Sequence, residues 1–276
     1  MTDRGTPPSA RPPQPAADHD PWADLRHLTA ARIGLKRTGA SVATGPMLDF
    51  RLAHARARDA VHEPLDRSRL SDDIAALDVE VIEVASAAED RQHYLMRPDH
   101  GRLLAADSEA VLAPHAGRHD VVFVVTDGLS ARAVQTHAQP VLAALLPALR
   151  TEGWRIAPVV VAHHGRVAIG DAVAALLRAD SVAILIGERP GLTAPDSMGA
   201  YLTWKPHAGT TDADRNCISN IRPDGIGYAD AAFKIAHLLR AMRARRRSGV
   251  QLKDDSDRLA IGEDTQTDKI RPGSAA

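Results

Sequence analysis

The residue of this sequence best suited to chemistry is its single cysteine, Cys217, together with the arginines near it. Arg215 and Arg222 flank the cysteine, and guanidinium groups can lower the pKa of a thiol and make it a nucleophile. A nucleophile also needs a general base within reach, and none lies close by in the sequence. Two other interpretations therefore stay open: a small buried residue in a polar loop, and a compact side chain that packs against a bound cofactor.

Glu188 is the second candidate, because it follows the apolar run at residues 181–186. It could simply pair with the neighbouring Arg189. Alternatively, a carboxylate at the carboxyl end of a strand can accept hydrogen bonds from the hydroxyls or amides of a large polar ligand. The glycines and prolines of residues 188–199 predict an ordered loop that forms one wall of a binding site.

Two neighbouring histidines, His163 and His164, also follow an apolar run. Adjacent side chains of a strand point to opposite faces of the sheet, so they rarely bind the same ion. No spaced triad of histidine, aspartate or glutamate accompanies them in the sequence. The sequence therefore predicts solvated or hydrogen-bonded histidines and no metal site.

The signatures of several large enzyme classes are missing from the sequence. There is no G-x-G-x-x-G after a strand, no Walker A loop, no H-E-x-x-H and no G-x-S-x-G. Nicotinamide dehydrogenases, P-loop NTPases, zincins and α/β-hydrolases thus lose their main support. The residues by themselves predict a binding domain with no catalytic residue of its own.

Composition narrows the class of protein further. The chain has 276 residues, and 34 Lys and Arg against 35 Asp and Glu give a net charge of −1, which argues against a general nucleic-acid binder. The arginine-rich end of the last predicted helix, residues 240–247, is explained by the helix dipole. One cysteine excludes an intrachain disulfide and fits the reducing cytoplasm. No apolar run approaches the roughly 18–20 residues of a membrane span, and no secretion signal is evident.

The elements that must position these residues are short apolar strands alternating with helices. Runs at 121–125, 156–162 and 181–186 are apolar apart from Ser181, which indicates a sheet covered on both faces. We predict an α/β fold, a Rossmann-like three-layer domain closed by a long helix at 228–247. Ligands of such sheets bind at the carboxyl ends of the strands.

That rule places three segments along one edge of the sheet: residues 126–130, 165–170 and 187–191. Before the sheet, Leu48, Leu52 and Ala55 recur at helical spacing. Residues 79–84 fit a strand or a helix continuation equally well. The predicted organisation is a disordered tail at 1–21, a mostly helical region at 22–116, the Rossmann-like domain at 117–250 and a flexible tail at 251–276.

Several stretches, in this order along the chain, resemble the small (light) subunit of ethanolamine ammonia-lyase. They are ARIGL (31–35), TGAS (38–41), LDFRLAHARARDAVH (48–62), VVFVVTDG (121–128), GRVAIGD (165–171), GERPGL (187–192), DSMGAYLT (196–203) and RNCISNIRP (215–223). The resemblance covers residues 25–250, with small departures such as Met198 and Phe233.

The resemblance implies a carbon–nitrogen lyase of ethanolamine degradation, which converts ethanolamine to acetaldehyde and ammonia with adenosylcobalamin. The family's large subunit is a barrel that holds the substrate. The small subunit's α/β domain covers the corrinoid, its helical N-terminal region contacts the large subunit, and the assembly is a hexamer of large–small heterodimers. By resemblance, the cofactor contacts of this chain are Val167, Glu188 and Cys217.

The sequence has no D-x-H-x-x-G motif, so we expect cobalt to keep its own dimethylbenzimidazole ligand, the base-on form. The expected location is the cytoplasm, either free or inside a bacterial microcompartment. One alternative is a stand-alone Rossmann-like nucleotide-binding module without a lyase partner. Another is a transferase that depends on Cys217.

Overall fold

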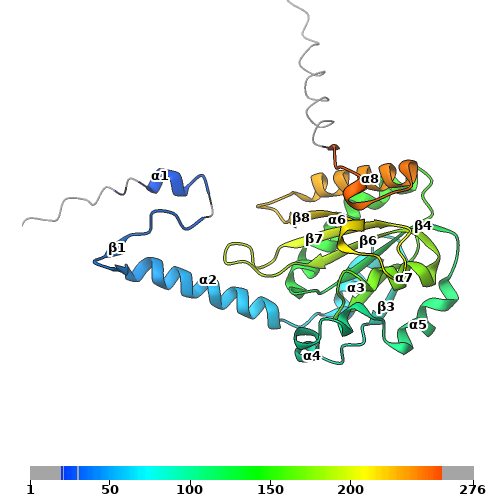
Figure 1. Ribbon diagram of the computed structural model, residues 1–276, viewed down its shortest axis with the longest axis horizontal. Helices are drawn as coiled ribbons and strands as arrows, with labels where there is room; N and C mark the ends of the chain where they lie inside the picture. The colour runs from blue at the N-terminus through cyan, green and yellow to red at the C-terminus, as the bar shows by residue number, and fades with distance from the viewer. Residues whose placement is uncertain (1–19, 21, 30, 257–276) are drawn as a thin grey trace, which may run out of the picture. The chain divides into compact units, whose positions relative to one another are not determined.

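The computed structural model describes residues 20, 22–29 and 31–256 (Figure 1). These form two compact units, of which the first ends at Arg51 and the second begins at Leu52. The predicted tail at 1–21 lies outside the described residues except for Asp20, and so does most of the tail at 251–276. The described start of the second tail is packed, because Leu252 is buried and its carbonyl accepts a hydrogen bond from the Asn216 amide at 2.7 Å.

The first unit contains a short helix and a small hairpin. These are α1 (Ala23–Arg26), β1 (Arg37–Thr38) and β2 (Ser41–Val42), and β1 and β2 pair antiparallel. Gly39 has a φ of 64° in the turn between the strands, a conformation that favours glycine. The helix α2 (Thr44–His62) begins in this unit and continues into the second, at the place where the sequence predicts a helix.

The second unit is built on a six-stranded mixed sheet, in the order β3-β5-β4-β6-β7-β8. Its first four strands in this order are parallel and the last two are antiparallel to their neighbours. The strands are β3 (Val81–Ala85), β4 (His119–Thr126), β5 (Val159–His163), β6 (Ala179–Gly187), β7 (Met198–Trp204) and β8 (Arg215–Ile221).

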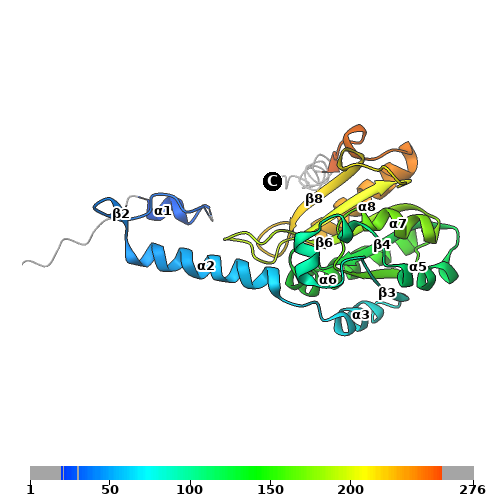
Figure 2. The same cartoon turned by 60° about the horizontal axis from the view of Figure 1, so that its bottom comes forward.

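Helices cover both faces of this sheet (Figures 1 and 2). One apolar cluster joins the strands to α3 (Arg67–Ala75), α6 (Ala131–Thr151) and α8 (Tyr228–Arg245). The other joins them to α5 (Ala106–Leu112) and α7 (Ile169–Leu177). The apolar run in β4 is unbroken because both faces of the strand are buried. Val121 and Phe123 belong to the first cluster, and Val122 and Val124 belong to the second.

Shorter elements complete the chain: α4 (Arg91–Met96) and the 3-10 turns His100–Arg102, Ala113–His115, Asp212–Asp214 and Gly249–Gln251. Among the described helices, none is both long enough and apolar enough to cross a membrane.

The predicted α/β class is confirmed, as are the strands predicted at 121–125 and 181–186, whereas the run 156–162 becomes a strand only from Val159 onward. The open question at 79–84 is settled in favour of a strand, β3, which pairs with β5. A hairpin and this strand interrupt the region 22–116, so its mostly helical character is not confirmed. Strands β7 and β8 were not predicted, and Cys217 lies exposed on β8 rather than buried in a loop.

Candidate functional site

The candidate site lies at the carboxyl ends of β4, β5 and β6, where the sequence places three segments on one edge. Hydrogen bonds between these segments confirm that arrangement. The Gly165 amide donates to Thr126 Oγ1 at 3.0 Å, and the Leu129 amide donates to the Gly187 carbonyl at 2.9 Å. The strand ends therefore form one connected rim.

A hollow of about 240 Å³ opens on this rim, and we call it the rim pocket. It contains two of the three site residues that the sequence predicts, Val167 and Glu188. Its lining is Tyr94, Gly128, Leu129, Arg166, Val167, Ile186, Gly187, Glu188, Arg189 and Tyr201. Tyr94 comes from α4 and Tyr201 from β7, so elements outside the predicted strand ends close the pocket.

The carboxylate of Glu188 is held on one oxygen and open on the other. Its Oε2 accepts hydrogen bonds from the Ser197 hydroxyl and from the Asn220 amide, the latter at 3.2 Å. Within the described part of the chain, no hydrogen bond engages Oε1 and no ion pair joins Glu188 to Arg189. The side chain is thus a fixed acceptor at the rim, which fits the ligand-binding interpretation better than simple pairing with Arg189.

Cys217 on β8 pairs in the strand register with Tyr201 on β7, and Tyr201 lines the rim pocket. Cys217 therefore lies beside this pocket. Burial raises the pKa of the Tyr201 phenol, and the adjacent thiol and the Glu188 carboxylate raise it further. The phenol therefore stays protonated and can donate a hydrogen bond at neutral pH. Tyr201 lies within the stretch 196–203, but no pattern in the sequence marks it as a site residue.

The arginines that could have activated Cys217 are engaged elsewhere. Arg215 donates to Asp171 Oδ2 at 2.6 Å, and Arg222 pairs with Asp224 at 3.5 Å. The thiol contacts the Ser219 hydroxyl at 3.4 Å. These contacts remove the support that the two arginines gave to a nucleophilic cysteine.

The two histidines behave differently from their prediction. Their rings stack at 3.7 Å between centroids, and Asp127 joins them, with potential ligand atoms of all three residues within 4.8 Å of one another. The expectation of opposite faces is wrong because β5 ends at His163, and His164 has a φ of 55°, outside the strand conformation.

A guanidinium already faces this cluster. Arg91 Nη1 lies 3.4 Å from Asp127 Oδ2 and donates to the Gly128 carbonyl at 2.7 Å. This positive charge disfavours a further cation beside the same carboxylate. The arrangement instead ties the loop after β4 to α4, and the absence of a bound metal stays a prediction.

Burial, together with the nearby charges of His164, Arg67 and Arg91, lowers the pKa of His163 to about 4. The unfolded chain takes up this proton below about pH 6.5, whereas the folded chain resists it until about pH 4. Stability should therefore fall as the pH drops through this range. Between pH 7 and pH 5 we expect His163 to account for up to about 2 kcal/mol of that loss.

Urea unfolding of His163→Asn at both pH values checks this expectation, because the variant should lose that part of the pH dependence. The exposed His62 supplies the control, His62→Asn, which should keep the slope of the unmodified chain. Equal slopes for His163→Asn and the unmodified chain would contradict the assignment.

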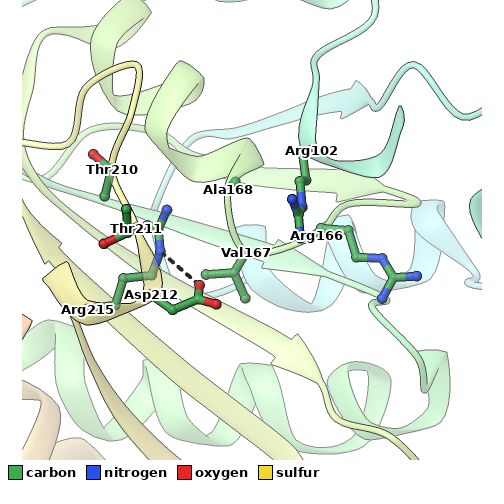
Figure 3. Close-up of a pocket in the computed structure, with 8 residues that line it drawn as sticks. All are labelled: Arg102, Arg166, Val167, Ala168, Thr210, Thr211, Asp212 and Arg215. Atoms are coloured by element: carbon green, nitrogen blue, oxygen red, sulfur yellow. Dashed lines mark ion pairs between the residues drawn. The ribbon is translucent and has the colours of Figure 1, made fainter. Parts of the chain in front are cut away.

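A second hollow, of about 410 Å³, adjoins the rim pocket (Figure 3). We call it the arginine hollow, and the two hollows share Arg166 and Val167. Its lining is Arg102, Arg166, Val167, Ala168, Thr210, Thr211, Asp212 and Arg215.

Comparison with known proteins identifies close relatives. The sequence model of the family described as ethanolamine ammonia-lyase light chain matches residues 19–253. The ethanolamine ammonia-lyase small subunit of Azotobacter vinelandii is 50% identical over 245 residues, which are 87% of this chain and 91% of the relative. That of Pseudomonas aeruginosa PAO1 is 49% identical over 250 residues, 89% of this chain and 92% of the relative.

Proposed function

Because this chain belongs to the family of the ethanolamine ammonia-lyase small (light) subunits, we propose that it helps to hold adenosylcobalamin against the large subunit. In this role it takes part in the conversion of ethanolamine to acetaldehyde and ammonia, without a catalytic residue of its own. The observation that carries the proposal is the rim pocket, where Val167 and Glu188 meet beside Tyr201 and Cys217.

These residues fit the chemistry of a corrinoid, whose ring edge carries many amide groups. The open Oε1 of Glu188 can accept hydrogen bonds from such amides, and the Tyr201 phenol can donate one. Val167 offers apolar contact that excludes water, and the exposed Cys217 is compact enough for close approach. The cofactor, when bound, supplies the radical chemistry.

The proposal also covers the type of domain, the state of the cofactor, the assembly and the location of the protein. Four parallel strands with helices on both faces support a Rossmann-like cofactor domain, to which β3 contributes from before residue 117. We propose that the cofactor stays base-on and that large–small pairs assemble into a hexamer. We also propose a cytoplasmic location, free or in a microcompartment.

Co-expression with the large subunit tests the proposal. We expect the two chains to co-purify, to take up adenosylcobalamin with a corrinoid spectrum, and to form acetaldehyde from ethanolamine only when the cofactor is present. Turnover by this chain alone without cobalamin, or a failure to join the large subunit, would overturn it.

Glu188→Gln is the first specific prediction for this complex. The amide keeps the shape of the side chain but removes the charge, so we expect adenosylcobalamin to bind about tenfold more weakly. Turnover at saturating cofactor should fall far less. Titration of the complex with cofactor measures the first effect, and the exposed Glu109→Gln is the matched control. A large loss of turnover with unchanged affinity would contradict the proposed role.

The helix α2 supports a contact between the N-terminal region and the large subunit. Of its 19 residues only Ala60 is buried, whereas Leu48 and Leu52 are 57% and 51% exposed. These two leucines are four residues apart and therefore lie on one face of the helix. An exposed apolar face of this kind gains free energy when a partner covers it.

Leu48→Ser should therefore weaken binding to the large subunit by about 1.5 kcal/mol, roughly tenfold in Kd. Analytical ultracentrifugation of the mixed subunits measures the change. Val111→Ser supplies the control, since Val111 is also exposed, at 47%, but lies on α5. Equal effects of the two substitutions would argue against α2 as the contact.

A further inference from the structure

A buried histidine on α6 contacts two other parts of the fold through its two ring nitrogens. His137 is 1% exposed, and its Nδ1 lies 2.9 Å from the hydroxyl of Tyr228, the first residue of α8. Its Nε2 lies 3.6 Å from Oδ2 of Asp196, in the loop between β6 and β7. These three residues line neither the rim pocket nor the arginine hollow.

The surroundings of His137 decide which of its nitrogens carries the hydrogen. Burial lowers the pKa of His137, although the Asp196 carboxylate acts in the opposite direction, so the ring is neutral at pH 7. Burial also raises the pKa of the Tyr228 phenol, which therefore keeps its hydrogen and donates it to Nδ1. The hydrogen of the neutral ring then lies on Nε2, where it faces a carboxylate that would repel a lone pair.

The attraction between this N–H and Asp196 is the feature that the fold leaves unexplained. Within the described part of the chain, the buried Nε2 of His137 has no hydrogen-bond partner, and the Asp196 carboxylate is the charge that compensates it. A buried donor without a full hydrogen bond costs free energy. Such a contact calls for a role other than stabilising the core.

Helix α6 holds the loop before β7 at two successive residues. Ser130, its N-cap residue, donates through its hydroxyl to the Pro195 carbonyl at 3.1 Å, and His137 faces Asp196. Ser130 and His137 are seven residues apart, which places them on the same face of the helix. Because Pro195 and Asp196 adjoin each other, this part of the loop is fixed relative to α6.

The next residue carries the constraint to the rim pocket. Ser197 donates through its hydroxyl to Glu188 Oε2, and its carbonyl accepts a hydrogen bond from the Glu188 amide at 2.9 Å. Both the side chain and the backbone of Glu188 are thus held by the residue that directly follows Asp196. The direction in which Glu188 Oε1 faces the pocket depends on this hold.

We infer that His137 is a positioning residue, which acts through Asp196 and Ser197 to fix the direction of the Glu188 carboxylate. Tyr228 supports the same role, because its hydroxyl keeps the N–H of His137 on the side of Asp196. Neither His137 nor Tyr228 needs to touch a ligand for this purpose. The inference rests on the proposed function, in which Glu188 accepts hydrogen bonds from the cofactor.

The test replaces the two partners of His137 in the complex with the large subunit, because loss of the buried ring itself would disturb the fold. Asp196→Asn keeps the shape of the side chain but removes its charge, so adenosylcobalamin should bind about fivefold more weakly. Tyr228→Phe removes only the hydroxyl and should act in the same direction. Turnover at saturating cofactor should fall far less in both variants. Asp255→Asn is the matched control, since it breaks another aspartate–histidine pair, with His237 at 2.8 Å, and should leave the Kd unchanged.

A double-mutant cycle separates positioning from a general structural role. In a Glu188→Ala background no carboxylate is left to orient, so Asp196→Asn should weaken adenosylcobalamin no further. The same loss in both backgrounds would mean that Asp196 acts only on the stability of the fold, and an unchanged Kd for Asp196→Asn alone would mean that it does not act at all. Either result overturns the inference while the proposed function stands. If the unmodified complex binds no adenosylcobalamin, the proposed function itself fails, and the inference fails with it.

Discussion

Replacement of Asp171 by alanine is expected to lower the free energy of unfolding by about 3–5 kcal/mol. The reason is that Arg215, the buried partner of Asp171, would lose its counter-charge. Arg215 is 2% exposed and donates two short hydrogen bonds to this carboxylate, whose own side chain is 12% exposed. Without Asp171, a buried guanidinium keeps only the distant Asp212 and a bond to the Thr203 hydroxyl at 3.0 Å.

Urea unfolding measures this effect, and two variants show its cause. Asp171→Ala combined with Arg215→Met removes both charges and should recover most of the lost stability. Asp180→Ala breaks the exposed ion pair with Lys205, 2.7 Å long, and should cost less than about 1 kcal/mol. If Asp171→Ala costs no more than Asp180→Ala, the buried pair does not stabilise the fold in this way.

Gly187→Ala is the second substitution with a large expected effect. A Cβ at this position would lie 2.0 Å from the Ser130 carbonyl oxygen and 2.5 Å from that of Asp127. Both are backbone atoms, so the chain itself must move. We expect a loss of about 3 kcal/mol or more in unfolding free energy. Cofactor affinity should fall with it, because this contact joins the loops that line the rim pocket.

Gly191→Ala, in the loop that follows β6, is the matched control, since the nearest atom to its added Cβ is 3.6 Å away. It should change stability by less than about 1 kcal/mol. Thermal unfolding and cofactor titration of both variants give the comparison. A Gly187→Ala protein as stable as Gly191→Ala would mean that the rim tolerates displacement.

Whether a strand can be predicted from the sequence depends on how far its two faces are buried. Strands β4, β5 and β6 are covered on both faces, so they appear in the sequence as unbroken apolar runs. Strand β8 was missed because only Arg215, Ile218 and Ile221 of its seven residues are buried, and the polar residues between them mark it as a loop. In residues 79–84, Glu80 and Glu83 are three residues apart among valines and an isoleucine, a spacing that does not separate a strand from a helix.

Whether a site residue can be predicted depends on whether it follows a strand that the sequence predicts. Val167 and Glu188 follow predicted strands, so topology alone places them on the rim. Tyr201 reaches the rim through the pairing of β7 with β6, which no local pattern reveals. The prediction for His163 and His164 was wrong because β5 ends at His163. The alternation of side chains along a strand therefore does not extend to His164.

The hold on Glu188 Oε2 bears on the entropy cost of binding a ligand at the rim pocket. Ser197 precedes β7 and Asn220 belongs to β8, so the two antiparallel strands lock the rotamer of a side chain that follows β6. Little rotational entropy is then left to lose when a ligand arrives. Strands β7 and β8 therefore preorganise the carboxylate that follows β6.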